Sequence, residues 1–100
     1  MNSIDKIYQT SVDNETDKIL KLPVSEFLTI GDYGNIESTI DKRKITISWW
    51  HYKFKENIHH VVFVSDRRFF LFLHKKYLSG AKFEEGKIVR LNDKELGQYD

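Results

Sequence analysis

Residues 44–74 are predicted to form three consecutive β-strands, and both faces of the sheet that they form are apolar. β-Branched and aromatic residues are enriched in residues 45–54, 58–64 and 69–73, and polar clusters separate these segments. An antiparallel sheet with one face in water alternates apolar and polar side chains, and these segments do not. Both faces of the predicted sheet therefore need a cover, which the neighbouring segments, a second copy of the chain or a partner can provide.

The turns between these strands set a predicted register. Two-residue turns at Glu56-Asn57 and Asp66-Arg67 assign each side chain to a face by alternation. One predicted face carries Trp50, Tyr52, Phe54, His59, Val61, Phe63, Phe70, Phe72 and His74. The other predicted face carries Ile47, Trp49, His51, Lys53, His60, Val62, Val64, Phe69, Leu71 and Leu73. A slip of one residue at either turn exchanges the faces of a strand but leaves both faces apolar.

The segment before these strands is predicted to be helical. Apolar residues within residues 3–21 recur with a period near 3.6, and polar interruptions at Ser11 and Glu15 favour two short helices over one. Pro23 ends the helical pattern. Residues 24–30 fit either a short helix or a strand.

The remaining segments complete an α+β prediction. Residues 36–40 form a further predicted strand after a loop, and Gly86 occupies the left-handed position of a predicted three-residue turn between two more strands. Asn92, with Glu95 three residues later, predicts the N-cap of a last helix. The predicted fold is a single domain, residues 1–100, with an N-terminal helix or helix pair, an antiparallel β-meander of about five to six strands and a short C-terminal helix.

Composition places the chain among globular proteins. It has 40% hydrophobic and 31% charged residues and a mean hydropathy of −0.52. The longest apolar runs are too short to span a bilayer, and the first residues lack the basic start and apolar run of a signal peptide. We therefore expect a cytoplasmic, unprocessed protein without a membrane partner. The absence of cysteine excludes disulfides, thiolate catalysis and cysteine zinc sites.

Charge is unevenly distributed along the chain. Residues 1–40 hold seven acids and three bases (net −4), residues 41–90 hold five and twelve (net +7), and residues 91–100 hold three and one (net −2). A basic, aromatic sheet is typical of a single-stranded nucleic-acid binder. Its stacking platforms would be Trp49, Trp50 and Tyr52, and its cations Lys42, Arg43, Lys44, Lys53, Arg67, Arg68, Lys75 and Lys76. The simpler explanation is that acidic helices dock on basic strands, which the pI of about 7.9 favours.

Four histidines form the candidate cluster for chemistry: His51, His59, His60 and His74. The predicted register places His59 across from His74, a spacing that suits a shared ligand or a pH-sensitive pair. A metal site needs a third donor, and the adjacent His59 and His60 point to opposite faces, so we expect no metal or cofactor. The serines lack a GxSxG setting and the glycines lack phosphate-loop spacing, so no catalytic motif supports an enzyme.

These observations predict a small intracellular protein-binding module of the inhibitor, immunity or regulatory type, without catalytic activity. Its anchors would be Trp49, Trp50, Tyr52, Arg67 and Arg68, because aromatic and arginine side chains dominate interfaces. A homodimer through an uncovered sheet face or edge strand is one form of this prediction. The alternatives are a single-stranded nucleic-acid-binding protein and an enzyme of unrecognised type that uses the sheet histidines.

Overall fold

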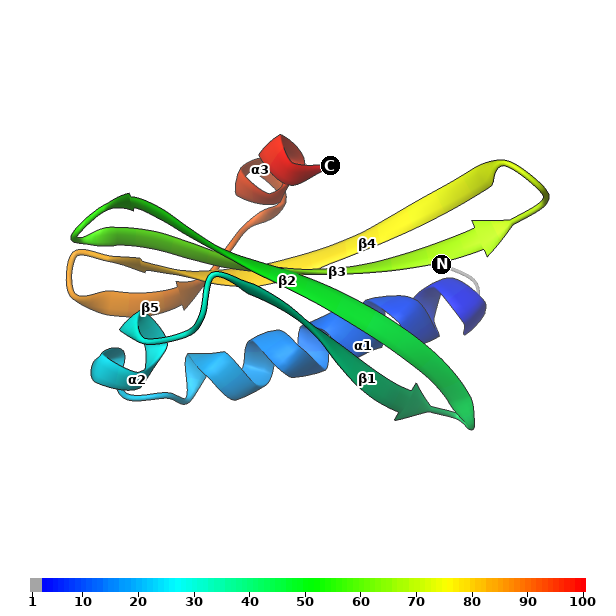
Figure 1. Ribbon diagram of the computed structural model, residues 1–100, viewed down its shortest axis with the longest axis horizontal. Helices are drawn as coiled ribbons and strands as arrows, with labels where there is room; N and C mark the ends of the chain where they lie inside the picture. The colour runs from blue at the N-terminus through cyan, green and yellow to red at the C-terminus, as the bar shows by residue number, and fades with distance from the viewer. Residues whose placement is uncertain (1–2) are drawn as a thin grey trace.

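The computed structural model describes residues 3–100 as a five-stranded antiparallel sheet with a long helix on one face and a short helix on the other (Figure 1). The elements are α1 (Ser3–Leu20), α2 (Val24–Leu28), β1 (Tyr33–Ile40), β2 (Arg43–Lys55), β3 (Ile58–Phe69), β4 (Leu73–Glu84), β5 (Lys87–Arg90), α3 (Asp93–Leu96) and the 3₁₀ helix η1 (Gly97–Tyr99). The strands follow one another in the order β1-β2-β3-β4-β5, which confirms the predicted α+β meander. Among residues 3–100, no helix is both long and apolar enough to cross a bilayer.

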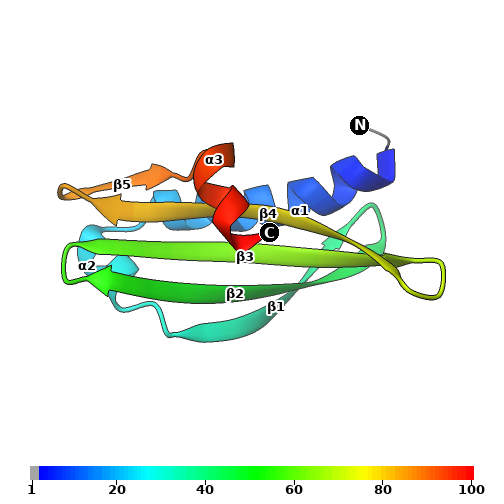
Figure 2. The same ribbon diagram turned by 90° about the horizontal axis from the view of Figure 1, so that it is seen from above.

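The two faces of the sheet have different covers (Figures 1 and 2). α1 crosses one face, which we call the helical face, and α3 with η1 lies over part of the opposite face, which we call the open face. The hydrophobic core lies between α1, α2 and the helical face. Its buried members are Val12, Phe27, Ile45, Ile47, Val61, Phe63, Tyr77, Ala81 and Phe83. Complete burial of such side chains stabilises the fold by roughly 1.5–3 kcal/mol for each large one.

α1 is one continuous helix of 18 residues, so the predicted pair of short helices is wrong. Ser11 and Glu15, which interrupt its apolar stripe, are buried but have partners close by in the helix. The Ser11 hydroxyl donates to the Tyr8 carbonyl at 2.6 Å, and the Glu15 carboxylate lies 2.6 Å from the Lys18 ammonium group. Buried polar groups with partners do not require the helix to end. Residues 24–30 contain a short helix, α2, rather than a strand.

The predicted register between β2 and β3 is wrong, because β2 contains a β-bulge. Lys55 lies across from Ile58, as a two-residue turn requires, but Lys53 lies across from His59, so Phe54 is the extra residue. This one-residue shift exchanges the faces of β3 relative to β2. Val61 therefore shares the helical face with the β2 residues that the prediction placed on the opposite side, and both faces remain apolar.

The predicted strand at residues 69–73 and the predicted turn at Asp66-Arg67 are also wrong. β3 continues to Phe69, which lies across from Leu73 of β4, and residues 70–72 form the loop between them. Phe70 adopts the left-handed conformation with φ of 56°. The apolar run is thus the tip of a long hairpin rather than a strand of its own.

The β1–β2 and β4–β5 hairpins also have two-residue turns. Consecutive positive φ values occur in both, 49° and 65° at Asp41 and Lys42 and 53° and 76° at Glu85 and Gly86. Two consecutive left-handed residues are characteristic of type I′ turns, whose twist matches that of the strands. The left-handed position of Gly86 is confirmed, although the loop has two residues rather than the predicted three.

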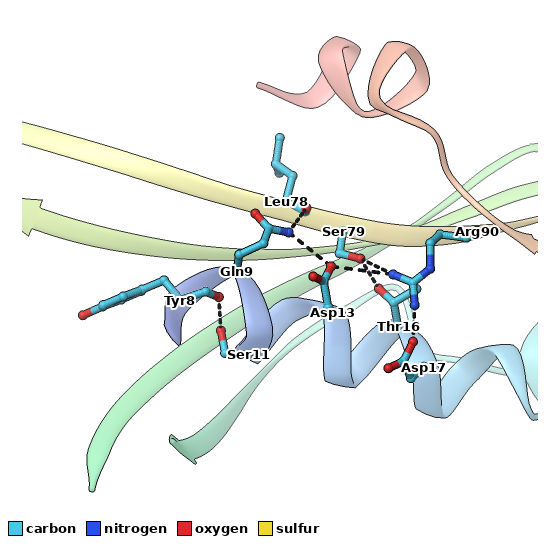
Figure 3. A network of polar contacts seen from close by, with 9 residues as sticks. All are labelled: Tyr8, Gln9, Ser11, Asp13, Thr16, Asp17, Leu78, Ser79 and Arg90. Atoms are coloured by element: carbon cyan, nitrogen blue, oxygen red, sulfur yellow. Dashed lines mark hydrogen bonds and ion pairs between the residues drawn. The ribbon is translucent and has the colours of Figure 1, made fainter. Parts of the chain in front are cut away.

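Polar contacts hold α1 against β4 and β5. They join the α1 residues Gln9, Asp13, Thr16 and Asp17 to the sheet residues Leu78, Ser79 and Arg90 (Figure 3). Thr16 and Ser79 are almost completely buried, and the Thr16 hydroxyl donates to that of Ser79 at 2.7 Å. Arg90 donates to the same Ser79 hydroxyl at 3.1 Å and forms ion pairs with both aspartates. The register of α1 on the sheet is therefore set by directional bonds as well as by apolar packing.

Gly80 lets the chain pass from β5 onto the open face. It lies across from Val62, so a side chain at this position would point to the open face. A Cβ atom there would lie 2.4 Å from the Val61 carbonyl oxygen and 2.9 Å from Leu91 Cδ1. Leu91 is buried and donates its backbone N–H to the Gly80 carbonyl at 2.9 Å. The residues after β5 thus pack closely over Gly80 before α3 begins.

We predict that Gly80→Ala lowers the free energy of unfolding by about 2 kcal/mol or more, because the added methyl group overlaps the Val61 carbonyl of the neighbouring strand β3. Urea unfolding followed by circular dichroism measures this loss. Gly97→Ala is the matched control, since no atom lies within 4 Å of its Cβ position and its φ is −57°. Equal losses in both variants would contradict the role of Gly80.

Candidate functional site

A groove of about 600 Å³ runs along the open face over β2, β3 and β4 and ends beside η1. Its lining changes character along the strands. Trp50, Tyr52 and Tyr99 line the end beside η1, together with the buried Val62. The far end is lined by Lys44, Thr46, Asp66 and Lys76. The groove therefore has an aromatic end and a charged end, which the strand register separates.

The aromatic end is built from stacked rings. Tyr52 stacks on Tyr99 with ring centroids 4.8 Å apart and on Phe54 at 6.3 Å. Trp50 is 40% exposed, although it projects from a central part of β2. An aromatic side chain that is held by a rigid strand and still exposed offers contact area at little cost in conformational entropy.

The chain's last residues supply one wall of this end. Asn92 caps α3 and forms the predicted capping box with Glu95, whose carboxylate lies 2.5 Å from Lys82 of β4. Tyr99 and His60 share a hydrogen bond of 2.8 Å between the phenol oxygen and Nδ1. Burial, with Tyr52 and Glu95 nearby, raises the pKa of Tyr99 to about 12, so its phenol keeps its proton at neutral pH.

The charged end carries cations on both sides of one acid. Asp66 of β3 lies across from Lys76 of β4, and its carboxylate contacts the His74 ring nitrogen at 3.1 Å. Lys44 and Arg68 are exposed, and within residues 3–100 neither forms an ion pair. This end of the groove therefore presents free cationic groups next to a single carboxylate.

The five predicted anchor residues fall into two groups. Trp50 and Tyr52 lie in the groove, and Arg68 is exposed on the same face. Trp49 lies half-buried on the helical face, where its indole covers Gly34 so closely that a Cβ atom there would be 2.6 Å from the ring. The structure thus brings together two of the three aromatic anchors.

Arg67, the last predicted anchor, also lies on the helical face. Its guanidinium is 3.3 Å from the Asp5 carboxylate, and its Nε donates to the Tyr77 hydroxyl at 3.1 Å. The Tyr77 hydroxyl in turn donates to Asp5, and this bond is the main reason that the pKa of Asp5 lies below its ordinary value. Lys75 contacts the same carboxylate at 3.2 Å. Arg67 therefore helps to attach α1 to the sheet and does not line the groove.

Sequence reasoning missed the contribution of Tyr99. The capping box at residues 92–95 predicts the final helix, but the face on which that helix docks follows from the packing over Gly80. The charged end was missed because the turn was predicted at Asp66, which places Asp66 and Lys76 outside the sheet. The corrected register would have identified both of them as neighbours.

The predicted pairing of His59 with His74 is wrong. His59 lies across from Phe83, and His74 lies across from Arg68. The nitrogen His59 Nδ1 is instead 2.8 Å from His51 Nε2, and His51 Nδ1 lies 2.7 Å from the Ile30 carbonyl oxygen. A carbonyl only accepts, so His51 carries its proton on Nδ1, and neutral His51 accepts at Nε2 the proton of His59 Nδ1.

This histidine pair is buried on the helical face, away from the groove. Burial is the main cause that lowers the pKa of His51, and burial also lowers the pKa of His60 on the open face. The described part of the chain, residues 3–100, holds no group of three or more acidic or histidine side chains that could bind a metal ion.

Comparisons with protein-family models, with curated protein sequences and with solved structures found no match to this chain.

We predict that the free energy of unfolding decreases as the pH falls from 7.5 to 5. An unfolded histidine titrates near its ordinary pKa of 6.5, whereas His51 and His60 titrate lower in the folded chain. Below pH 6.5 the unfolded chain therefore binds more protons, so the stability present above this pH is lost as the pH falls. Urea unfolding at several pH values measures this slope.

The double variant His51→Gln/His60→Gln should show a smaller decrease over the same range. A slope that survives in the double variant would show that other groups cause it.

Proposed function

We propose that the chain is a protein-binding module without catalytic activity, and that its groove holds an extended segment of another polypeptide. The observation that carries this proposal is the exposed Trp50 beside the half-buried Tyr52 and Tyr99 in one groove. Aromatic anchors in a concave site contribute most of the binding energy in protein interfaces. A module of this type acts by occupying a surface of its partner, as inhibitors, immunity proteins and regulatory proteins do. We propose the predicted cytoplasm as its location.

The two ends of the groove define the partner's chemistry. An aromatic or aliphatic side chain fits beside Trp50 and Tyr52, and a carboxylate fits beside Lys44 and Lys76. Trp50 and Lys44 are six positions apart on one strand, which is about 20 Å at roughly 3.3 Å per residue. The partner segment that we propose is therefore an extended stretch of about six residues, with an apolar anchor at one end and an acid at the other.

The alternative of a nucleic-acid binder has less support in the geometry. Three cations of the basic strands, Arg67, Lys75 and Arg90, form ion pairs with α1 acids on the helical face. Part of the basic charge of residues 41–90 thus serves to attach α1 to the sheet.

The alternative of a histidine enzyme also has less support. The groove serine, Ser48, donates its hydroxyl proton to the Asn35 side chain at 2.8 Å. His60 is hydrogen-bonded to Tyr99, and the His51–His59 pair is buried beside Phe27 of α2 and the Ile30 carbonyl. This arrangement favours binding by a preformed surface over proton transfer to a substrate.

Selection of a random peptide display library on the immobilised chain tests the proposal. We predict that enriched peptides combine an apolar anchor with acidic residues. Trp50→Ala should weaken the binding of an enriched peptide by about tenfold or more in calorimetric titration, because it removes the exposed anchor. Val24→Ala, a partly exposed apolar position on α2, is the control and should leave the affinity unchanged.

The same titration includes a single-stranded oligonucleotide. Binding of the oligonucleotide that is lost with Trp50→Ala, without enrichment of any peptide, would replace the proposal with the nucleic-acid alternative. Enriched peptides whose affinity does not respond to Trp50→Ala would place the binding surface elsewhere.

A further inference from the structure

The β3–β4 hairpin ends in an exposed apolar tip. The four consecutive residues Phe70, Leu71, Phe72 and Leu73, which we call the hairpin tip, are 82%, 83%, 87% and 52% exposed. Figures 1 and 2 show the hairpin projecting past the other elements at one end of the longest axis of the molecule, which measures 42 Å. Exposed apolar clusters of this kind mark sites of interaction with proteins or membranes.

The local backbone holds these side chains away from the fold. Phe70 has φ of 56°, a conformation that glycine or asparagine adopts more readily than a bulky aromatic residue. The last ring of β3, Phe69, lies under the Arg67 guanidinium group at 5.0 Å. A strained, exposed phenylalanine contributes little to folding, which points to a use outside the fold.

Basic residues surround the base of the hairpin tip. Residues 66–76 contain four lysines and arginines and one acid, a net charge of +3 with neutral His74. Two cross-strand pairs lie behind the tip, Arg68 with His74 and then Arg67 with Lys75, and Lys76 comes next along β4. We call these five residues the basic collar. The Asp5 carboxylate lies against Arg67 and Lys75, so the collar keeps a net positive charge after this pairing.

We propose that the hairpin tip inserts into the surface of an anionic lipid bilayer while the basic collar contacts the headgroups. Arg68 lies across from His74, one pair behind Phe69 and Leu73, which form the last pair before the loop at residues 70–72. Apolar groups at a membrane interface are buried by about 5–10 Å, and a short tip with cations directly behind it suits this shallow depth. Anionic lipids attract each nearby lysine or arginine by about 1 kcal/mol.

This proposal departs from the expectation of no membrane partner, which rested on the lack of a spanning segment and of a signal peptide in the sequence. A tip of four residues enters one leaflet and leaves the sheet in water. The aromatic end of the groove lies further along the same sheet, so membrane contact leaves Trp50 and Tyr52 open, whereas Lys76 belongs both to the basic collar and to the charged end of the groove.

Sedimentation of the full chain with lipid vesicles tests the proposal. We expect binding to vesicles of phosphatidylcholine mixed with phosphatidylglycerol, and much weaker binding to phosphatidylcholine alone. Leu71→Ser/Phe72→Ser should weaken binding to the anionic vesicles by about tenfold or more, because two large apolar side chains no longer enter the bilayer. Tyr33→Ser, at a 76% exposed position of β1, is the matched control and should bind like the parent chain.

Two further variants separate the contributions. Arg68→Gln/Lys76→Gln should weaken binding to anionic vesicles alone, and added salt should have the same effect. Trp50→Ala should bind vesicles normally, so a failure of the peptide proposal is distinguishable from a failure here. Absence of vesicle binding, or equal binding by the Leu71→Ser/Phe72→Ser variant, would overturn the proposal. A dimer in analytical ultracentrifugation that these tip substitutions dissociate would also overturn it, because the tip would then bind a second copy.

Discussion

The attachment of α1 to one face of the sheet is the interaction on which the rest of the structure depends. The buried apolar side chains of β2, β3 and β4 that form the core lie on the helical face, and α1 is the one long helix among residues 3–100. Its apolar stripe, its buried Thr16–Ser79 hydrogen bond and its ion pairs commit it to the helical face. The open face keeps only the short cover of α3 and η1, so a groove with exposed aromatic rings is the part of the sheet that no helix fills.

The basic sheet has a structural use before any functional one. Asp5, Asp13 and Asp17 of α1 meet cations of β3, β4 and β5 on the helical face. Partly buried pairs of this kind favour one orientation of a helix over the others more than they add to stability. Other cations stay exposed, among them Lys44 and Lys76 at the charged end of the groove and Arg68 at the base of the hairpin tip. The same excess of lysine and arginine therefore divides into an internal set and an external set.

Local rules predicted most elements, and long-range packing decided the rest. The α+β class, the meander, the Asn92 capping box and the left-handed Gly86 follow from short patterns with a direct physical cause. The predicted register is wrong beyond Phe54, because a bulge adds one residue there. When both faces of a sheet are apolar, the alternation of side chains does not reveal such a shift. The hairpin tip was taken for a strand because its residues favour strands, whereas a turn with a left-handed phenylalanine has no sequence signature. Trp50 and Tyr52 were predicted as anchors, but Tyr99 joins them only through tertiary packing.

The close packing of Leu91 over Gly80 has a consequence for the wall of the groove that α3 and η1 form. α3 and η1 have no buried residue of their own, and they are held by Leu91 before them, the Glu95–Lys82 contact and the Tyr99–His60 hydrogen bond. Segments with so little buried area open locally at a small fraction of the free energy of global unfolding. The wall can therefore detach as a hinged flap while the core between α1 and the sheet stays intact. The groove is rigid along its strands and adjustable at its aromatic end.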